Sequence, residues 1–435
     1  MKYKNYLLVL LMIILACNCV DRLVLGVVLQ GIKKDLHLTD TALGFLSGIA
    51  FAAMYSLMGI PIARWADRGN RVTIISSTAA IWSVAVALCG AVTSFWQLLL
   101  VRVAVGIGEA GCIPPANSLI ADYFSREERP RAAARYMMGL PIALIVGYLV
   151  AGALNERFGW RETFVLVGLP GVALALIAWL TLREPRLAKA GASETETLSQ
   201  PSRPAPGIGA ILRLLWCNRT FRNLLFCYAL WYFFGYGLLQ WQPTFFIRSH
   251  GLKSSEVGMW LSLVTGGGSL LGTYLGGEWG ARFAPKNERL QLIAVAGMFC
   301  FFAVFNVATY LAGSYRVAFT LLAVGQIGGA MAQGPILSTL QTLIVPSMRA
   351  TALAVLFLFS NLIGMGLGPL ATGVLSDALH PWTGDDSLRY ALVVLSPGYF
   401  WAAWHLLAAS RTVTSDMSGI ECSGSYVRHE VPSGA

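Results

Sequence analysis

Residues 98–115 read LLLVRVAVGIGEAGCIPP, an apolar run that contains two ionisable residues, Arg102 and Glu109. They are seven residues apart, which is two turns of an α-helix, so both lie on one face with their Cα atoms roughly 10 Å apart. A charge inside an apolar membrane segment is costly and is retained where it faces a bundle interior and has a partner. The run therefore predicts a membrane-spanning helix that carries a functional site.

The composition of the whole chain agrees with a membrane protein. Of its 435 residues, 56% are hydrophobic and only 12% are charged, whereas about 25% are charged in soluble globular proteins. The net charge of +10 is spread over short loops and forms no basic patch with stacking aromatics, so we expect no nucleic-acid partner. The eight cysteines and five histidines show no metal-ligand spacing, so we expect no metal site, no cofactor and no disulfide.

Twelve apolar segments are long enough to span a bilayer. They are residues 7–30, 41–63, 72–93, 96–121, 133–154, 163–182, 221–247, 257–279, 290–312, 315–345, 350–376 and 388–409. The polar stretch between the sixth and the seventh is rich in Pro, Ser and Ala, as flexible linkers are. We therefore predict an all-α integral membrane protein with twelve transmembrane helices in two six-helix bundles. The predicted domains are the first bundle (1–182), a linker (183–220), the second bundle (221–411) and a tail (412–435).

The distribution of Lys and Arg predicts the orientation of the chain. With the N-terminus inside, 22 of the 32 basic residues lie on the inner side, 8 lie on the outer side, and Arg22 and Arg102 lie within spans. This bias predicts a multi-pass protein of the plasma (inner) membrane with a cytoplasmic linker and both termini in the cytoplasm. The first apolar segment continues past Asp21 to about Gln30, so we expect a retained helix rather than a cleaved signal peptide.

The two halves carry traces of a duplication. Residues 63–68 (ARWADR) in the first half correspond to residues 277–282 (GEWGAR) in the second. Three further residues recur at a constant spacing, namely Pro115, Ser118 and Arg129 as Pro335, Ser338 and Arg349. Many secondary transporters are built from repeated halves and hold their substrate between them near the bilayer midplane.

Residues 63–71 (ARWADRGNR) resemble the G-x-L-x-D-R-x-G-R motif of the major facilitator superfamily, with matches at Asp67, Arg68 and Arg71. The resemblance implies a conformational latch in which Asp67 pairs with basic residues or a helix N-terminus of the other bundle in one conformation and releases them in the other. A solvated, positively charged inner loop is the alternative interpretation.

The N-terminal part of the chain, residues 1–180, is similar to the spinster-like branch of that superfamily, which includes sphingolipid and lysolipid transporters. The similarity rests on residues 21–48 (DRLVLGVVLQGIKKDLHLTDTALGFLSG) and on the R-x-x-x-G-x-G-E-A string that begins at Arg102. The acidic residue of the branch's N-x-x-D-R string corresponds to Asp21, and the Arg and Glu of its fourth helix correspond to Arg102 and Glu109.

Asp21 and Glu109 are the candidate proton carriers, and Arg102 is both a candidate for tuning them and a candidate anchor for a substrate anion. Burial and a neighbouring guanidinium act on the proton affinity of a carboxyl in opposite directions, so a paired carboxyl can respond when its surroundings change. The alternative is that permanent Arg102–Glu109 or Arg22–Asp21 ion pairs serve only to fix helix packing.

The second half offers aromatic and uncharged polar groups instead of buried charges. Those on the predicted seventh helix follow helical i, i+3, i+4 spacing, which is typical of packing or of an interfacial belt as well as of a pocket. The candidate substrate-binding residues are Arg102, Tyr228, Trp231, Tyr232, Tyr236, Gln240, Gln326, Gln333 and Asn361. A site that is charged on one side and aromatic on the other suits a small amphipathic molecule, such as a lysolipid, a fatty acid or an aromatic acid.

We therefore expect a monomeric secondary transporter that moves a small amphipathic or organic-anion substrate by alternating access, coupled to protons. The chain lacks an ATP-binding G-x-x-x-x-G-K-[ST] loop, and the glycines of residues 106–111 (GIGEAG) lie in mid-helix rather than after a strand. We find no catalytic constellation, so we expect no enzyme. Two alternatives are an uncoupled facilitator of the same fold and a non-transporting receptor or sensor, which the short polar tail after Arg411 does not favour.

Overall fold

The computed structural model describes residues 2–186, 208–283, 287–345 and 348–429. Within these ranges the chain consists of helices and short connections, without a strand. Most of the predicted linker (187–207) and the end of the predicted tail (430–435) lie outside the described residues.

The helices of the first half group into six membrane-crossing units. They are α1 (Lys2–Leu36), α2 and α3 (Asp40–Ser47, Ile49–Arg68), α4 (Arg71–Cys89), α5 and α6 (Phe95–Glu109, Ile113–Tyr123), α7 and α8 (Arg129–Met137, Gly139–Phe158) and α9 (Trp160–Thr181).

The second half begins with a short helix and then repeats this plan. Its helices are α11 (Ile208–Cys217), α12 (Arg219–His250), α13, η1 and α14 (Ser254–Leu261, Ser262–Gly267, Gly268–Phe283), α15 (Glu288–Leu311), α16 and α17 (Tyr315–Met331, Gln333–Leu343), α18, η3 and α19 (Arg349–Phe359, Ser360–Leu367, Gly368–Thr383), the 3₁₀ turn η4 (Gly384–Asp386), α20 (Ser387–Leu395) and α21 (Gly398–His429). The segments η1 and η3 are π-helical.

Ten helical runs of the described residues are long and apolar enough to cross a membrane. The last of them, Thr351–Met417, contains the predicted span 388–409 and all but the first residue of the predicted span 350–376. The predicted span 257–279 is helical as α13, η1 and α14, but it is not among the ten runs. The helical units therefore follow the predicted spans along the chain.

Local sequence explains where several helices begin and break. Asn70, Asn218 and Asn287 each accept a hydrogen bond from the backbone amide three residues on, as N-cap side chains do. The fourth predicted span breaks between α5 and α6, where Pro114 and Pro115 stand in the first turn of α6. Proline is tolerated there because the first amides of a helix have no partner within the helix.

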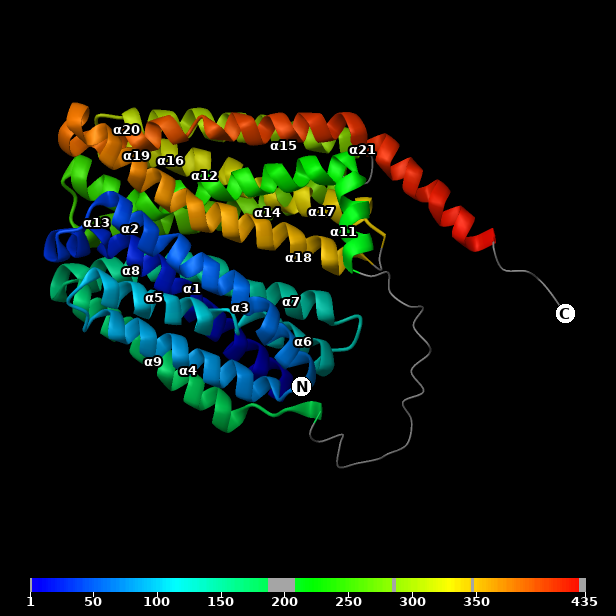
Figure 1. The fold of residues 1–435 in the computed structure, drawn as a ribbon, viewed down its shortest axis with the longest axis horizontal. Coiled ribbons are helices and arrows are strands. Elements are labelled where there is room, and N and C mark those ends of the chain that lie inside the picture. Colours follow the sequence, from blue (N-terminus) through cyan, green and yellow to red (C-terminus); the bar gives the residue numbers. More distant parts are fainter. Residues whose placement is uncertain (1, 187–207, 284–286, 346–347, 430–435) are drawn as a thin grey trace.

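The two halves form two bundles that lie side by side (Figure 1). One end, which we call the Asp40 end, carries α2, α13 and α20, and the other, the Asp67 end, carries α6, α7 and α11 (Figure 1). Helix α1 begins at the Asp67 end and leads to Asp40 at the opposite end.

The apolar core joins the bundles at one end only. The largest cluster of buried residues draws from both halves, for example Leu46 with Trp241 and Phe245. Two smaller clusters each belong to a single half, one around Leu11 and the other around Leu340. The halves are therefore packed together towards the Asp40 end and separately towards the Asp67 end.

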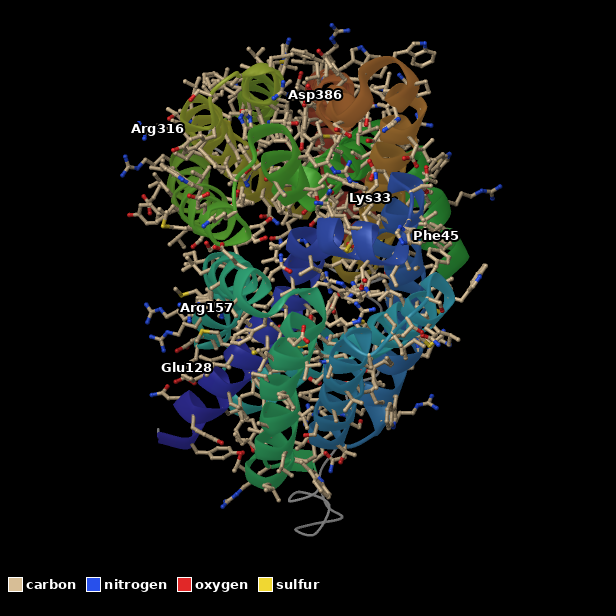
Figure 2. All side chains as sticks on the ribbon, turned by 90° about the vertical axis from the view of Figure 1, so that its left-hand side faces the viewer. Lys33, Phe45, Glu128, Arg157, Arg316 and Asp386 are labelled. Carbon is tan, nitrogen blue, oxygen red and sulfur yellow. The ribbon has the colours of Figure 1, made fainter. Side chains whose placement is uncertain are left out.

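Polar contacts close the Asp40 end, which faces the viewer in Figure 2. Arg248 of α12 binds both carboxylate oxygens of Asp40 at 2.7 Å. Lys33 and Ser376 also reach this carboxylate, each at 2.7 Å, so it is held by both halves. Because Asp40 is buried, these contacts supply the partners that a buried charge requires.

Candidate functional site

Four charged side chains meet between α1 and α5. Arg22 binds Glu109, with 2.7 Å from Nη2 to Oε2, and Arg102 binds Asp21, with 2.8 Å from Nη1 to Oδ2. Sequence analysis considered the pairs Arg102–Glu109 and Arg22–Asp21, so the structure exchanges the partners. The reason is that adjacent residues of a helix point about 100° apart, so Asp21 and Arg22 meet different turns of α5.

The two ion pairs differ in their exposure. The side chains of Asp21, Arg102 and Glu109 are 0–1% exposed, whereas that of Arg22 is 20% exposed. Arg22 therefore belongs to the border of the cluster, and Arg102, which sequence analysis favoured as an anion anchor, is enclosed within it.

Aromatic rings and a residue of the second half surround Arg22. Its guanidinium lies 4.8 Å from the ring centres of both Phe51 and Tyr55, within the range of cation–π attraction. Its Nη1 lies 3.7 Å from the sulfur of Met365 on η3. It also interacts with the side chain of Tyr236 on α12. Arg22 is thus the charged residue of the cluster that contacts the opposite half.

Several polar atoms of the cluster are buried without a hydrogen-bond partner. They include one oxygen of each carboxylate, Oδ1 of Asp21 and Oε1 of Glu109, together with Nε of Arg102 and Nδ2 of Asn18. Buried polar atoms are normally hydrogen-bonded, and exceptions often mark functional sites. Each carboxylate therefore keeps one oxygen at which a proton can be held.

The predicted aromatic series of the second half forms a stack that leads to this cluster. The ring centres of Tyr228 and Tyr232 are 4.9 Å apart, and those of Tyr232 and Tyr236 are 5.4 Å apart. Trp231 packs edge-on against Tyr228 at 5.2 Å, and Gln333 also interacts with Tyr228. The structure therefore brings these five predicted residues together along α12 and α17.

The remaining predicted polar residues are Gln240, Gln326 and Asn361. Gln326 donates to the hydroxyl of Ser269 at 3.1 Å, within the second half. Gln240 lies against Gly26 of α1, so close that a Cβ at Gly26 would meet its carbonyl oxygen at 3.0 Å. Asn361 is partly buried on η3.

The residues of the predicted latch make their contacts within the first half. Arg71 is buried and binds Glu184 and Asp122, the latter at 2.7 Å. Arg186 donates to the backbone oxygen of Asp67 at 2.8 Å. The side chains of Asp67 and Arg68 are exposed, and among the described residues they have no hydrogen bond or ion pair. Among the described residues, the predicted latch residues therefore make no polar contact with the second half.

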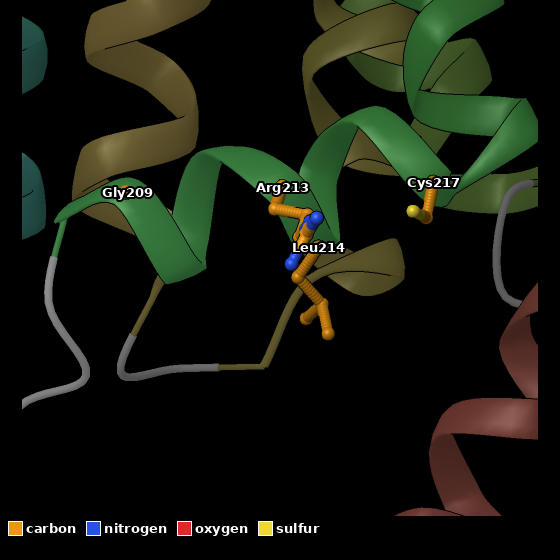
Figure 3. A pocket seen from close by; sticks show the side chains of 4 residues that line it. All are labelled: Gly209, Arg213, Leu214 and Cys217. Carbon is orange, nitrogen blue, oxygen red and sulfur yellow. The ribbon is translucent and has the colours of Figure 1, made fainter.

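Two surface pockets lie outside the charged cluster. One, of about 560 Å³, is lined by four residues of α11, namely Gly209, Arg213, Leu214 and Cys217 (Figure 3). The described residues that line it all belong to one helix at the Asp67 end, so we assign it no substrate. The other, of about 180 Å³, lies between α1 and α8 and is lined by Met12, Ile13, Ala16, Cys17, Val20, Ile142, Ala143 and Val146. No metal-binding cluster occurs in the described part of the chain.

Sequence analysis missed Asp40, Glu184 and the role of Arg22. A weak signal existed for Asp40, because an acidic residue after Thr39 at the start of a span is typical of a helix N-terminus. Glu184 lay just inside the predicted linker and carried no signal of its own.

Comparison with known proteins identifies the family. Residues 11–369 match the Major Facilitator Superfamily. The chain belongs to this superfamily. The predicted family and fold are thereby confirmed, and superfamily members of this type are transporters rather than enzymes.

Individual members place the chain more closely. It is 32% identical to an MFS-type efflux pump of Mycolicibacterium smegmatis over 87% of this chain and 86% of that protein. It is 26% identical to Protein spinster homolog 1 of Xenopus tropicalis, over 90% and 78% respectively. A crystal structure of a bacterial homolog to the human lysosomal transporter spinster, inward-facing and unoccupied, has 32% identity and a TM-score of 0.84, and covers 95% of this chain and 98% of that one. The chain is a multi-pass superfamily transporter of the spinster type.

A first prediction concerns the unequal burial of the two pairs in this superfamily member. Asp21→Asn leaves Arg102 enclosed without a counter-charge, so we expect the free energy of unfolding to fall by about 3–5 kcal/mol. Glu109→Gln leaves Arg22 with its aromatic contacts and some exposure, so we expect a loss of only about 1–2 kcal/mol. Thermal unfolding in detergent measures both losses of stability. A larger loss for Glu109→Gln than for Asp21→Asn would contradict the conclusion that Arg102–Asp21 is the more enclosed pair. The double variant Asp21→Leu/Arg102→Met should recover stability, because it removes both charges.

A second prediction concerns Glu184, which lies beyond the end of α9. Burial raises the pKa of this carboxyl, but hydrogen bonds from Arg71 outweigh burial and leave the pKa below its ordinary value of 4.5. A lowered pKa means that ionised Glu184 stabilises the folded state above that value, and that this contribution is lost as the pH falls through the lowered pKa.

We therefore expect Glu184→Gln to lower the free energy of unfolding by about 1–3 kcal/mol at pH 7 and by much less at pH 3. Thermal unfolding of both proteins at the two pH values measures this difference. The exposed Glu127, changed to Gln, provides the control and should have no effect at either pH. An equal loss from Glu184→Gln at both pH values would show that its charge is not responsible.

Proposed function

We propose that this protein is a proton-coupled transporter of a small amphipathic or organic-anion substrate, with the Arg22–Glu109 pair as the coupling switch. The observation that carries the proposal is the position of this pair. Glu109 is fully buried, while its partner Arg22 is partly exposed and contacts Met365 and Tyr236 of the second half. A substrate held between the halves therefore meets Arg22 first.

The chemistry of the switch follows from charge balance. When Glu109 is ionised, Arg22 is neutralised by it, with contacts at 2.7 and 2.8 Å. A proton added to Glu109 removes that counter-charge and leaves the guanidinium to bind an anionic group, to which it can donate two parallel hydrogen bonds. Proton binding and anion binding are then linked, because each favours the same state of Arg22.

The second pair has a supporting part in this proposal. Arg102 and Asp21 are enclosed beside the switch, and Oδ1 of Asp21 has no hydrogen-bond partner. We assign Asp21 as a second proton carrier and Arg102 as its counter-charge.

The surroundings of Arg22 support an amphipathic substrate. The guanidinium of Arg22 offers a charged environment to an anionic head, and the rings of Phe51, Tyr55 and Tyr236 around it offer an aromatic one. A molecule with an anionic head and a hydrocarbon or aromatic body, such as a lysolipid, a fatty acid or an aromatic acid, matches these two environments. We propose that such a molecule contacts Arg22, Tyr236 and the stacked residues along α12.

The transport cycle we propose is alternating access, with this structure as its inward-facing state. The Asp40 end is closed by contacts between the halves, whereas among the described residues those of the predicted latch make no polar contact with the second half at the Asp67 end. The excess of Lys and Arg on the connections of the Asp67 end favours a cytoplasmic position for it, with both chain termini on that side. The spinster homolog structure described as inward-facing agrees with this orientation.

The third prediction tests the coupling in liposomes that contain purified protein and a pH-sensitive dye. Lysolipids, fatty acids and aromatic acids are supplied in turn. We expect one class to drive proton movement with the wild type and with the control Glu127→Gln. Glu109→Gln should abolish proton movement while labelled substrate still exchanges, because Arg22 remains available. Arg22→Gln should weaken apparent affinity about 10- to 100-fold, the value of a hydrogen bond to a charged group.

Two results would contradict this proposal. In the first, the wild type moves no protons and labelled substrate crosses equally well with the wild type and with Glu109→Gln. The protein would then be an uncoupled facilitator. If Arg22→Gln leaves the affinity unchanged, the substrate does not bind at this guanidinium.

A further inference from the structure

At the Asp40 end, acidic side chains of each half bind the first backbone amides of a helix in the other half. Asp377 of α19 accepts hydrogen bonds from the amides of Asp40 and Thr41, at 3.1 and 2.7 Å, where α2 begins. Glu156 of α8 accepts one from the amide of Ser255, at 3.0 Å, where α13 begins. The first amides of a helix lack partners within it, and a negative charge there is favoured by the helix dipole.

The two contacts are copies of each other. The alignment that places residues 63–68 on residues 277–282 also places Asp40, the first residue of α2, on Ser254, the first residue of α13. The acids come from α8 and α19, which are the helices that complete the fifth and the eleventh predicted spans. The capped helices are therefore equivalent helices of the two halves, and so are the helices that supply the acids.

The packing around the caps is duplicated as well. A Cβ on Gly373 would strike the backbone oxygen of Asp40, and one on Gly152 would strike that of Ser254. In both copies the glycine precedes the capping acid by about one helical turn, Gly373 before Asp377 and Gly152 before Glu156. Small residues let helices approach closely enough for a side chain of one to reach the backbone of the other.

We propose that Glu156 and Asp377 are positioning residues of a duplicated lock, in which each half caps a helix of the other and both caps must release before the Asp40 end opens. The inference rests on the alternating access proposed above. The α2 copy carries in addition the ion pairs of Asp40 with Lys33 and Arg248, so it is the stronger of the two. The Asn155–Ser254 hydrogen bond of the α13 copy, at 2.8 Å, is equivalent to the Ser376–Asp40 hydrogen bond of the α2 copy.

The test measures how often the Asp40 end opens, without any substrate. Thr244 of α12 is fully buried and faces the backbone oxygen of Gly26 in the other half, so a thiol there is reached only when the halves separate. Thr244→Cys is placed in a protein whose eight native cysteines are replaced, and its reaction rate with a water-soluble maleimide is measured in lipid nanodiscs.

We expect Glu156→Ala and Asp377→Ala each to raise this rate about fivefold, as the loss of one helix cap would, and the double variant to raise it about 25-fold, because the two locks close one opening. Asp385→Ala removes an exposed acid at the same end that takes no part in either cap, and it should leave the rate unchanged.

A parallel protein that retains only Cys227, which is buried in the second half, reports unfolding. If an alanine variant makes Cys227 reactive, that variant is replaced by Glu156→Gln or Asp377→Asn. These amide side chains keep a hydrogen-bond acceptor but carry no charge. We expect each of them to raise the reaction rate of Thr244→Cys about twofold. An unchanged rate in either single variant, a double variant no faster than the singles, or an equal rise with Asp385→Ala would overturn the proposal. None of these outcomes depends on proton coupling or substrate.

Discussion

Four charges have to be held in a medium that cannot solvate them, and the arrangement of α1 and α5 follows from that requirement. A buried ion that loses its partner costs several kcal/mol, so each charge must sit within about 3 Å of its opposite. Two crossed pairs, separated by two helical turns on α5, fix both the rotation of α1 and its position along α5. The second-half segments α12 and η3, which carry the stacked tyrosines and Met365, then meet a first half in which each of these four charges already has its counter-charge.

The two ion pairs also differ in their surroundings. The Arg102–Asp21 pair is buried, and it joins two helices of the first half. The Arg22–Glu109 pair touches the second half through Arg22, so its surroundings change whenever the halves move. A single cluster thus contains one enclosed pair and one pair that is in contact with the second half.

Much of the fold could be predicted because it depends on local properties of the chain. Apolar length located the spans, and Asp67, Arg68 and Arg71 pointed to the superfamily that the comparisons confirm. The pairing of Arg22 with Glu109 could not be predicted, because it depends on how two helices are rotated against each other. The same is true of Asp40 and Glu184, whose partners lie in other helices. The assigned roles of the site residues and of the latch remain predictions.

The helices that carry the contacts between the halves share one backbone feature. The unit of α2 and α3 is interrupted at Gly48, that of α7 and α8 at Met138, and the two units of the second half contain the π-helical segments η1 and η3. Irregular turns have poorer hydrogen bonding than a regular helix, so bending is concentrated there. Each half therefore has two interrupted units, and these four units meet in pairs across the boundary between the halves. The backbone is least regular in the helices whose contacts would have to change if the halves moved.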